Sequence, residues 1–441
     1  MRIVLGLNAG KKALCENRGI NFEVPEVLLE RTNEIFGTSL SVYETVELIV
    51  NQVRTRKDEA IKELSEKLDG TTFDSLEISC SDVSNAYEQV STEVIEALKL
   101  AEARIRKFHE NTVPKSWHDS NEGYGQLINP VGRVGAYVPG GTAAYPSTVL
   151  MTTVPAKVSG VNEVFICTPP TTNGAPNPIV LVAADIAGVD RIFTIGGAQA
   201  IAAMAYGTES VPKADVICGP GNVFVTLAKK IVFGDVGIDG LYGPTETAII
   251  ADEFANPTLC AVDLLAQAEH DQLAAPVLIT TSKDFARQVS DELYLRLERL
   301  DRKIIALEAI KNRGMIVVVN DLEEAFDLSN EFAPEHVSLA VKNPYDKAKY
   351  IKNAGAIFLG EFSHEVLGDY VAGPSHVMPT GGTARFSSGI NVNSFLKISP
   401  LVGVGKDVAR KLSSAASVIA RAEGLTAHAE AAEVRDEILG E

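Results

Sequence analysis

Features of several common protein classes are missing from this chain of 441 residues. Its five cysteines are scattered and include no Cys-x-x-Cys pair, which argues against a disulfide framework and against a thiolate metal site. No apolar run reaches the ~18 residues of a membrane span. The amino terminus, Met1 to Asn8, lacks the apolar core of a signal peptide. We therefore expect a soluble, cytoplasmic protein.

Positive charge is also scarce. The chain has 40 basic and 58 acidic residues and a formal net charge of -18, which argues against nucleic acid or an anionic membrane as the main partner. Two well-known signatures are absent as well: H-E-x-x-H of zinc hydrolases and G-x-G-x-x-G of the usual dinucleotide-binding fold. An ordinary zinc hydrolase and an ordinary NAD fold are both disfavoured.

Hydrophobic periodicity instead predicts an α/β protein. Residues up to about 125 are mainly helical in pattern, with amphipathic stretches at 41–68 and 90–108. Beyond Pro130, short apolar runs end in glycine or proline and lead into alanine-rich segments. Such runs, which predict strands of parallel sheets, occupy 133–139, 163–168, 191–195, 215–218, 275–281, 315–320, 338–341 and 355–360. A further strand, introduced by a turn, is predicted within 241–252. After Ser387 the sequence has few strand-like apolar runs. Residues 409–439 are predicted to form a helical tail with too few apolar residues for a hydrophobic core of its own.

These patterns divide the chain into four predicted parts. We expect an N-terminal helical segment over 1–30, and a discontinuous α/β domain over 31–135 and 245–385. A second α/β domain, over 136–244, is inserted into the first. The tail over 386–441 is expected to pack on another subunit. The predicted fold class is thus two incomplete Rossmann-like parallel-sheet domains with helical ends.

Two patterns point to bound ligands. In the predicted helix Asp263-Leu-Leu-Ala-Gln-Ala-Glu-His-Asp271, Gln267 and His270 are one turn apart and share a face. They could occupy two corners of a metal site, or belong to a solvated surface helix. Glycine-rich strand ends, such as Gly219-Pro-Gly-Asn222, could hold a pyrophosphate with their backbone N–H groups, or merely form tight turns.

Two further patterns are candidates for catalysis. Glu335 and His336 are adjacent after Pro334, in a segment where neighbouring side chains can serve two different proton transfers; the alternative is an exposed loop pair. Cys218, beside Gly219, could be a thiol nucleophile. It has no basic neighbour in the sequence to lower its pKa, so a buried structural cysteine is favoured.

Taken together, these stretches resemble histidinol dehydrogenase, from about Asp58 to Arg435. The matching segments, in chain order, are Gly135-Ala-Tyr-Val-Pro-Gly-Gly141, Ile195-Gly-Gly-Ala-Gln-Ala200, Gly219-Pro-Gly-Asn222, Asp263 to Asp271, Phe332-Ala-Pro-Glu-His336, Gly368-Asp369 and Glu423-Gly-Leu-Thr-Ala-His428. So many separate matches in the same order make the resemblance specific.

The resemblance implies an enzyme that oxidises L-histidinol to L-histidine with NAD, the last step of histidine biosynthesis. It implies a homodimer in which the tail crosses to the partner, so that sites are shared between subunits. Glu335 and His336 would be catalytic. One zinc ion per subunit would be bound by Gln267, His270, Asp369 and His428. Residues 136–244 would bind NAD through Tyr137, Gln199 and Asn222, and the substrate would contact Thr245, Glu423, His336 and the four zinc ligands.

Four positions depart from the family pattern. Thr245 stands where serine is common, Ser375 where asparagine is usual, and His364 and Gln272 where proline is frequent. None of them removes a proposed ligand or base. Three other readings remain open: a dehydrogenase of the same scaffold for another small polar alcohol such as a sulfonated diol, a zinc hydrolase, and a nucleotide-binding regulator without catalysis.

Overall fold

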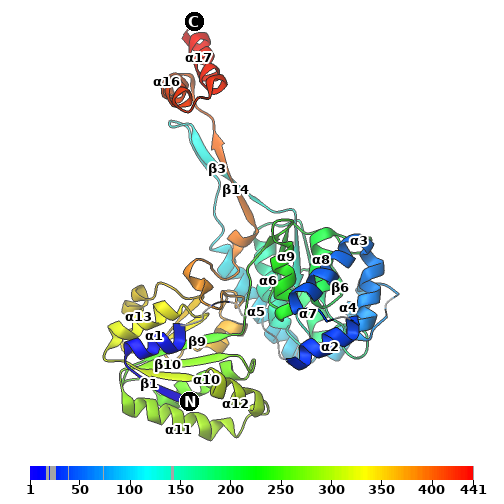
Figure 1. The fold of residues 1–441 in the computed structure, drawn as a ribbon, viewed down its shortest axis with the longest axis vertical. Coiled ribbons are helices and arrows are strands. Elements are labelled where there is room, and N and C mark those ends of the chain that lie inside the picture. Colours follow the sequence, from blue (N-terminus) through cyan, green and yellow to red (C-terminus); the bar gives the residue numbers. More distant parts are fainter. Residues whose placement is uncertain (16–18, 20–25, 38, 73, 141–143, 441) are drawn as a thin grey trace. The chain divides into compact units, whose positions relative to one another are not determined.

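The computed structural model describes residues 1–15, 19, 26–37, 39–72, 74–140 and 144–440. By compactness they form two units (Figure 1). Unit 1 comprises Met1–Thr112 and Val131–Phe395, and unit 2 comprises Val113–Pro130 and Leu396–Glu441. Within the described residues, no helix combines the length and the apolar character needed to cross a membrane.

Unit 1 contains a six-stranded parallel sheet in the order β1-β11-β10-β9-β12-β13. Helices cover both of its faces (Figure 1). Ile249 and the next residue, Ile250, belong to different apolar clusters, so successive side chains of β9 point to opposite faces. The strands are β1 (Arg2–Leu5), β9 (Glu246–Ala251), β10 (Ala275–Thr280), β11 (Met315–Val318), β12 (His336–Ala340) and β13 (Ala356–Leu359). One face packs on α10 (Pro257–Ala268), α11 (Lys283–Leu297) and α12 (Lys303–Asn312), and the other on α1 (Leu7–Cys15) and α13 (Leu322–Phe332).

A second parallel sheet of unit 1 has five strands in the order β6-β5-β4-β7-β8. It too has helices on both faces, which accounts for its almost wholly apolar strands. The strands are β4 (Arg133–Tyr137), β5 (Glu163–Thr168), β6 (Arg191–Thr194), β7 (Val216–Cys218) and β8 (Gly237–Ile238). Helices α4 (Cys80–Gln89), α5 (Thr92–Glu110), α6 (Pro146–Val158) and α7 (Pro178–Ala187) cover one face; α3 (Val42–Asp69), α8 (Gly197–Tyr206) and α9 (Val223–Val232) cover the other, and α2 (Glu26–Phe36) packs on α3. The two sheets confirm the predicted fold class.

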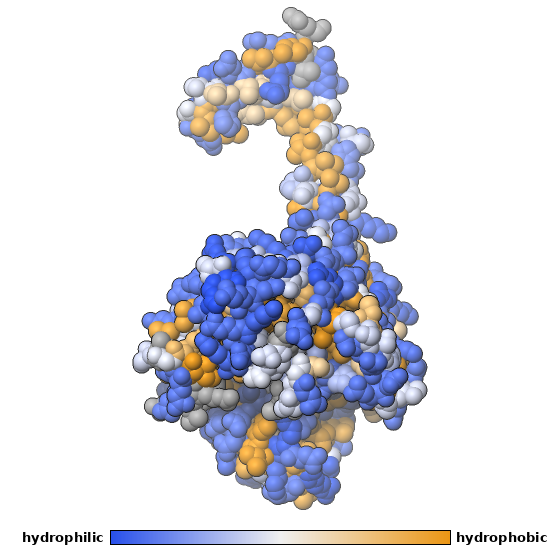
Figure 2. Space-filling model, turned by 90° about the vertical axis from the view of Figure 1, so that its right-hand side faces the viewer, coloured by the Kyte–Doolittle hydropathy of each residue, from blue (hydrophilic) through white to orange (hydrophobic). Residues whose placement is uncertain are grey.

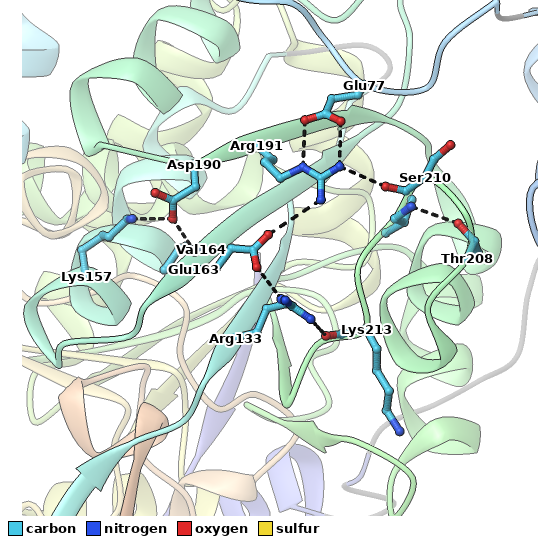
Figure 3. Close-up of polar contacts among 11 residues, drawn as sticks. Glu77, Arg133, Lys157, Glu163, Val164, Asp190, Arg191, Thr208, Ser210 and Lys213 are labelled. Carbon is cyan, nitrogen blue, oxygen red and sulfur yellow. Dashed lines mark hydrogen bonds and ion pairs between the residues drawn. The ribbon is translucent and has the colours of Figure 1, made fainter.

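Polar side chains connect the beginnings of β4, β5 and β6 (Figure 3). The Arg191 guanidinium donates two hydrogen bonds to the Glu77 carboxylate, at 2.8 and 2.7 Å. Arg133 Nε donates to Glu163 at 2.6 Å, and Glu163 also lies 3.8 Å from Arg191. Because parallel strands begin at one edge, these contacts fasten the amino edge of the sheet and leave its carboxyl edge to the glycine-rich loops.

Unit 2 is built from an antiparallel sheet and a helical hairpin. Its strands β2 (Trp117–Asp119), β3 (Tyr124–Pro130) and β14 (Leu396–Val402) pair in the order β14-β3-β2. Helices α16 (Lys406–Ala422) and α17 (Thr426–Gly440) are joined by an ion pair of 2.6 Å between Arg421 and Glu433. Apolar surface gathers along the strands and on the helices of this unit (Figure 2), where the exposed side chains include Leu127, Ile398, Val402, Leu412, Val418 and Ile419.

The structure corrects three details of the predicted organisation. The N-terminal segment is not helical throughout, because Arg2–Leu5 forms the short edge strand β1, which pairs with β11. The tail contains strand β14, hidden in the sequence by Pro400 and by the exposure of most of its residues. Helices α3, α4 and α5, assigned from the sequence to the first α/β domain, pack instead on the second sheet.

Candidate active site

The predicted catalytic residues lie at the amino edge of the six-stranded sheet, where its strands begin. Thr245 immediately precedes β9, and His336 is the first residue of β12. In the ladder between these two strands, Thr247 is the partner of His336. A helix that follows a parallel strand runs back along the sheet, which returns the end of α10 to this same edge.

Thr245 connects the amide of Gln267 with the carboxyl group of Glu335. Its Oγ1 is 2.9 Å from Gln267 Oε1 and 2.6 Å from Glu335 Oε2, yet a hydroxyl has only one proton to donate. Gln267 is buried, and its Nε2 has no hydrogen-bond partner among the described residues. Turning the amide over removes both conflicts, because Nε2 then donates to Thr245 and Oε1 is free to bind a cation.

Glu335 is held in place by two donors. Its Oε2 accepts hydrogen bonds from Thr245 and, at 3.2 Å, from the backbone N–H of Glu246. Burial raises the pKa of Glu335 to about 8, although these two hydrogen bonds act in the opposite direction. A positive charge in the site would favour the ionised carboxylate, the form that can accept a proton.

His336 is buried, with an exposed fraction of 3%. Its Nδ1 is 3.9 Å from Glu335 and 4.0 Å from Glu365, and its Nε2 is 4.0 Å from Asp369. Neither ring nitrogen has a hydrogen-bond partner among the described residues. Burial, with smaller contributions from His270 and His376, lowers the pKa of His336 to about 3. The ring is therefore neutral and can accept a proton at neutral pH.

Helix α15 (Glu365–Tyr370) brings two more carboxyl groups to His336. Burial raises the pKa of Asp369 to about 7 and that of Glu365 to about 8. His376 Nδ1 is 2.7 Å from the backbone oxygen of Asp369, which fixes the end of this helix. Glu365 was not among the predicted site residues. Its signal is its position one helical turn before Asp369, which places both on one face.

The helix that carries Gln267 ends earlier than the sequence predicts. Helix α10 stops at Ala268, and His270 lies in the following turn, whose backbone N–H donates to the Gln267 carbonyl at 3.3 Å. Gln267 and His270 are thus related by a hydrogen-bonded turn, whereas the sequence predicted that both lie in one helix. Neighbouring atoms desolvate the His270 ring and lower its pKa, with a further contribution from Arg302, although the residue keeps exposed surface.

A metal site can be tested against these side chains. Among the described residues, no three His, Cys, Asp or Glu side chains gather as a metal ion would require. Unit 1 supplies only two predicted ligands of these types, His270 and Asp369, because Gln267 is an amide and His428 belongs to unit 2. The nitrogen and oxygen donors fit zinc, and the unsatisfied amide of the buried Gln267 is the kind of group that a cation would complete.

The two predicted site residues of the tail lie close to the turn between its helices. Glu423 follows the last residue of α16, and His428 lies in the first turn of α17. Both side chains are exposed in unit 2. Their participation in a site stays a prediction.

The predicted NAD-binding residues lie at the carboxyl edge of the five-stranded sheet, at the ends of three strands. Tyr137 ends β4, and its hydroxyl accepts the Gly197 N–H at 3.1 Å. Gln199, in the first turns of α8, donates to Asp69 at 3.4 Å. Asn222 caps α9, its Oδ1 accepting two backbone N–H groups at 3.1 and 3.2 Å. The edge at which these residues meet is the usual ligand edge of a parallel sheet.

A buried ion pair fixes the glycine-rich loop that precedes Asn222. Lys229 Nζ contacts the Asp239 carboxylate and donates to the Gly219 carbonyl at 3.0 Å. Asp239 in turn accepts the Gly219 N–H at 2.7 Å. Gly219 has a φ of +108°, and a Cβ there would lie 2.1 Å from the backbone carbonyl oxygen of Tyr137. Only glycine fits where these two loops meet.

The alternative of a thiol nucleophile is not supported by the surroundings of Cys218. Its side chain is fully buried, and burial raises the pKa of the thiol well above its ordinary value. A reactive cysteine needs the opposite, a lowered pKa and an accessible sulfur.

Comparison with known proteins identifies the family. The family model described as histidinol dehydrogenase matches residues 36–436. A histidinol dehydrogenase of a Synechococcus strain is 49% identical over 400 residues, covering 90% of this chain and 92% of the relative. That of Dehalococcoides mccartyi strain 195 is 46% identical over 433 residues, covering 98% of this chain and 99% of the relative.

A solved structure agrees with the sequence relatives. The crystal structure of histidinol dehydrogenase from Elizabethkingia anophelis superimposes with a TM-score of 0.92 at 34% identity, covering 100% of this chain and 99% of the other. The fold, the matched length and the identity all point to one group of enzymes. The chain belongs to the histidinol dehydrogenase family of oxidoreductases.

Proposed function

We propose that this protein is a zinc-dependent dehydrogenase that oxidises L-histidinol to L-histidine through histidinal, using two molecules of NAD. This reaction is the last step of histidine biosynthesis. Family membership supports the proposal, and the observation that carries it is the buried, neutral imidazole of His336 beside Glu335. One residue can accept the alcohol proton while the other activates water, as a two-step oxidation requires.

Zinc would be bound by Gln267, His270 and Asp369, with His428 supplied by a second chain. When bound, the metal would act as a Lewis acid that holds the imidazole and amino nitrogens of histidinol, and NAD would accept a hydride in each oxidation. Thr245 supports this site by holding the Gln267 amide, and it replaces the serine hydroxyl common in the family without loss of the hydrogen bond.

In the first oxidation His336 is the proton acceptor. Its neutral ring takes the hydroxyl proton of histidinol while the carbinol carbon loses hydride, giving the aldehyde. Burial keeps the ring unprotonated before the substrate arrives. The protonated ring is then stabilised by the carboxyl groups of Glu335, Glu365 and Asp369, which lie 3.9 to 4.0 Å from its nitrogens.

In the second oxidation Glu335 acts as the base for water. The hydrogen bonds from Thr245 and from the Glu246 backbone stabilise its ionised form and aim the free oxygen away from Thr245. Water attacks the aldehyde carbon as Glu335 takes its proton, which gives a hydrated aldehyde. Loss of a second hydride and a proton from this hydrate gives the carboxylic acid.

We also propose a cytoplasmic homodimer with shared sites. The five cysteines are free thiols, which suits a reducing compartment. Unit 2 exposes apolar side chains on its strands and helices, as a surface that packs on a second chain would. Glu423 and His428 would then complete the partner's site.

The reaction is tested by its stoichiometry. Zinc-loaded protein is incubated with limiting histidinol and excess NAD, and NADH is measured by its absorbance at the end point. Two NADH per histidinol are expected, and one would show that the aldehyde is released. Turnover of a sulfonated diol with no turnover of histidinol would favour the alternative dehydrogenase on this scaffold.

A further inference from the structure

Glu365 is a buried carboxyl group that the proposed chemistry does not use. Its exposed fraction is 1%, and it opens helix α15 above the beginnings of β9 and β12. A buried carboxyl group is costly unless its oxygens have partners. The contacts of its two oxygens therefore indicate what it does.

The first oxygen, Oε1, already accepts two hydrogen bonds. It accepts hydrogen bonds from the Thr247 hydroxyl and, at 2.8 Å, from the Ser338 hydroxyl. Thr247 is paired with His336 across the ladder, and Ser338 lies two residues after His336 in β12. Because side chains alternate along a strand, all three point to the same face of the sheet, and Glu365 lies over that face.

The second oxygen, Oε2, is available to accept a hydrogen bond. It has no hydrogen-bond partner among the described residues, and neither has His336 Nδ1, which is 4.0 Å away. Glu335 is equally close to Nδ1, but its Oε2 already accepts two hydrogen bonds. The backbone carbonyl of Glu246 also lies near the ring, but it carries no charge with which to stabilise a protonated imidazole.

We propose that Glu365 is a positioning residue for His336: its Oε2 accepts the Nδ1 proton and so leaves Nε2 as the base. The inference rests on the proposed role of His336. A shift of about 1 Å would close the gap to hydrogen-bond length, and such bonds often tighten only when substrate is bound. A positive charge in the site would favour the ionised form of Glu365, against the effect of its burial on the pKa. The carboxylate would then stabilise the imidazolium formed when the alcohol proton is taken.

The test is Glu365→Gln. Thr247 and Ser338 donate to the side chain, so they would hold the amide oxygen and turn the amide nitrogen toward Nδ1. Two donors cannot share a hydrogen bond, so the proton of the ring moves to Nε2, the wrong nitrogen for a base. We expect kcat to fall about a hundredfold or more, with KM for histidinol changed less than about threefold. Glu365→Asp should restore part of the rate.

A double-mutant cycle separates positioning from a general structural role. In a His336→Ala background, Glu365→Gln should cause no further loss of rate, because its effect passes through the imidazole. Zinc content and the unfolding midpoint should match the parent. Glu323→Gln, at an exposed position of α13, is the matched control and should leave the rate unchanged. An additive loss in the double variant, or an unchanged rate in Glu365→Gln, would overturn the proposal.

A spectroscopic readout makes the outcome independent of turnover. With ¹⁵N-labelled histidine, the nitrogen shifts of His336, assigned by their loss in His336→Ala, report which nitrogen carries the proton. The proton is expected on Nδ1 in the parent and on Nε2 in Glu365→Gln; the same tautomer in both would refute the idea. If Glu365→Gln does not fold, Ser338→Ala removes one donor that holds the carboxylate, and we expect a smaller fall in kcat with the proton still on Nδ1; an unchanged kcat would refute the idea. An active His336→Ala would instead overturn the proposed function itself.

Discussion

Replacing Lys229 by methionine should destabilise unit 1 strongly. The lysine and Asp239 form an ion pair whose exposed side-chain fractions are 2% and 0%. Methionine keeps much of the volume but removes the positive charge from the buried Asp239 carboxylate, which keeps the N–H groups of Gly219 and Gly240, at 2.7 and 2.8 Å. Removing one member of a buried ion pair costs about 3–5 kcal/mol. That loss is a large part of the 5–15 kcal/mol that typically stabilises a folded domain.

The assay is denaturant unfolding followed by far-ultraviolet circular dichroism, since Trp117, the one tryptophan, lies in unit 2. The double variant Lys229→Met, Asp239→Leu removes both charges and should recover at least ~1 kcal/mol of the loss. Burial already raises the pKa of Asp239, and without Lys229 the carboxyl would take up a proton more readily. The cost of Lys229→Met should therefore shrink as the pH is lowered. A loss below about 1 kcal/mol at neutral pH would refute this account of the pair.

Four further outcomes are expected. His336→Ala should retain zinc, measured by elemental analysis, while turnover falls by about 10²–10⁴; loss of the metal would show that His336 is a ligand. Glu335→Gln should slow the oxidation of supplied histidinal far more than that of histidinol in single-turnover assays, whereas equal slowing would contradict its role as the base for water. Mixing His428→Ala chains with His336→Ala chains should restore part of the activity in hybrid dimers, and no recovery would argue against shared sites. Burial of His109 lowers its pKa to about 4, so the unfolded chain binds the proton first and stability should fall by about 3 kcal/mol as the pH drops from 6.5 to 4; His109→Phe should flatten that dependence in pH-resolved unfolding curves.

Much of the fold could be predicted because its strands are buried on both faces. Runs such as Val164-Phe-Ile-Cys167 are apolar throughout and are soon followed by proline or glycine, so the sequence indicates both the type of element and where it ends. The strands that escaped prediction are β1, β2, β3, β8 and β14, and none of them is buried along its whole length. The sequence also could not assign α3, α4 and α5 to a sheet. An amphipathic helix reveals that it packs, but not on which partner.

Some residues of the candidate site could likewise be predicted from the sequence, and others could not. Glu335 and His336 could be predicted because adjacent titratable residues are unusual beside a buried strand. Both side chains are buried in the structure. Glu365 did not stand out, because a single glutamate at the start of a short helix is ordinary in sequence. Its importance arises from the hydroxyl groups of Thr247 and Ser338, which reach it only through the pairing of β9 with β12.

The location of the proposed catalytic residues at the amino edge of their sheet has an electrostatic consequence. In a parallel α/β layer this edge carries the ends of helices, where the peptide dipoles leave a partial negative charge. The opposite edge, which the other sheet uses for its glycine-rich loops, carries the beginnings of helices and a partial positive charge. The two opposite edges of one kind of α/β layer can thus attract ligands of opposite charge, a metal cation at one edge and a pyrophosphate at the other.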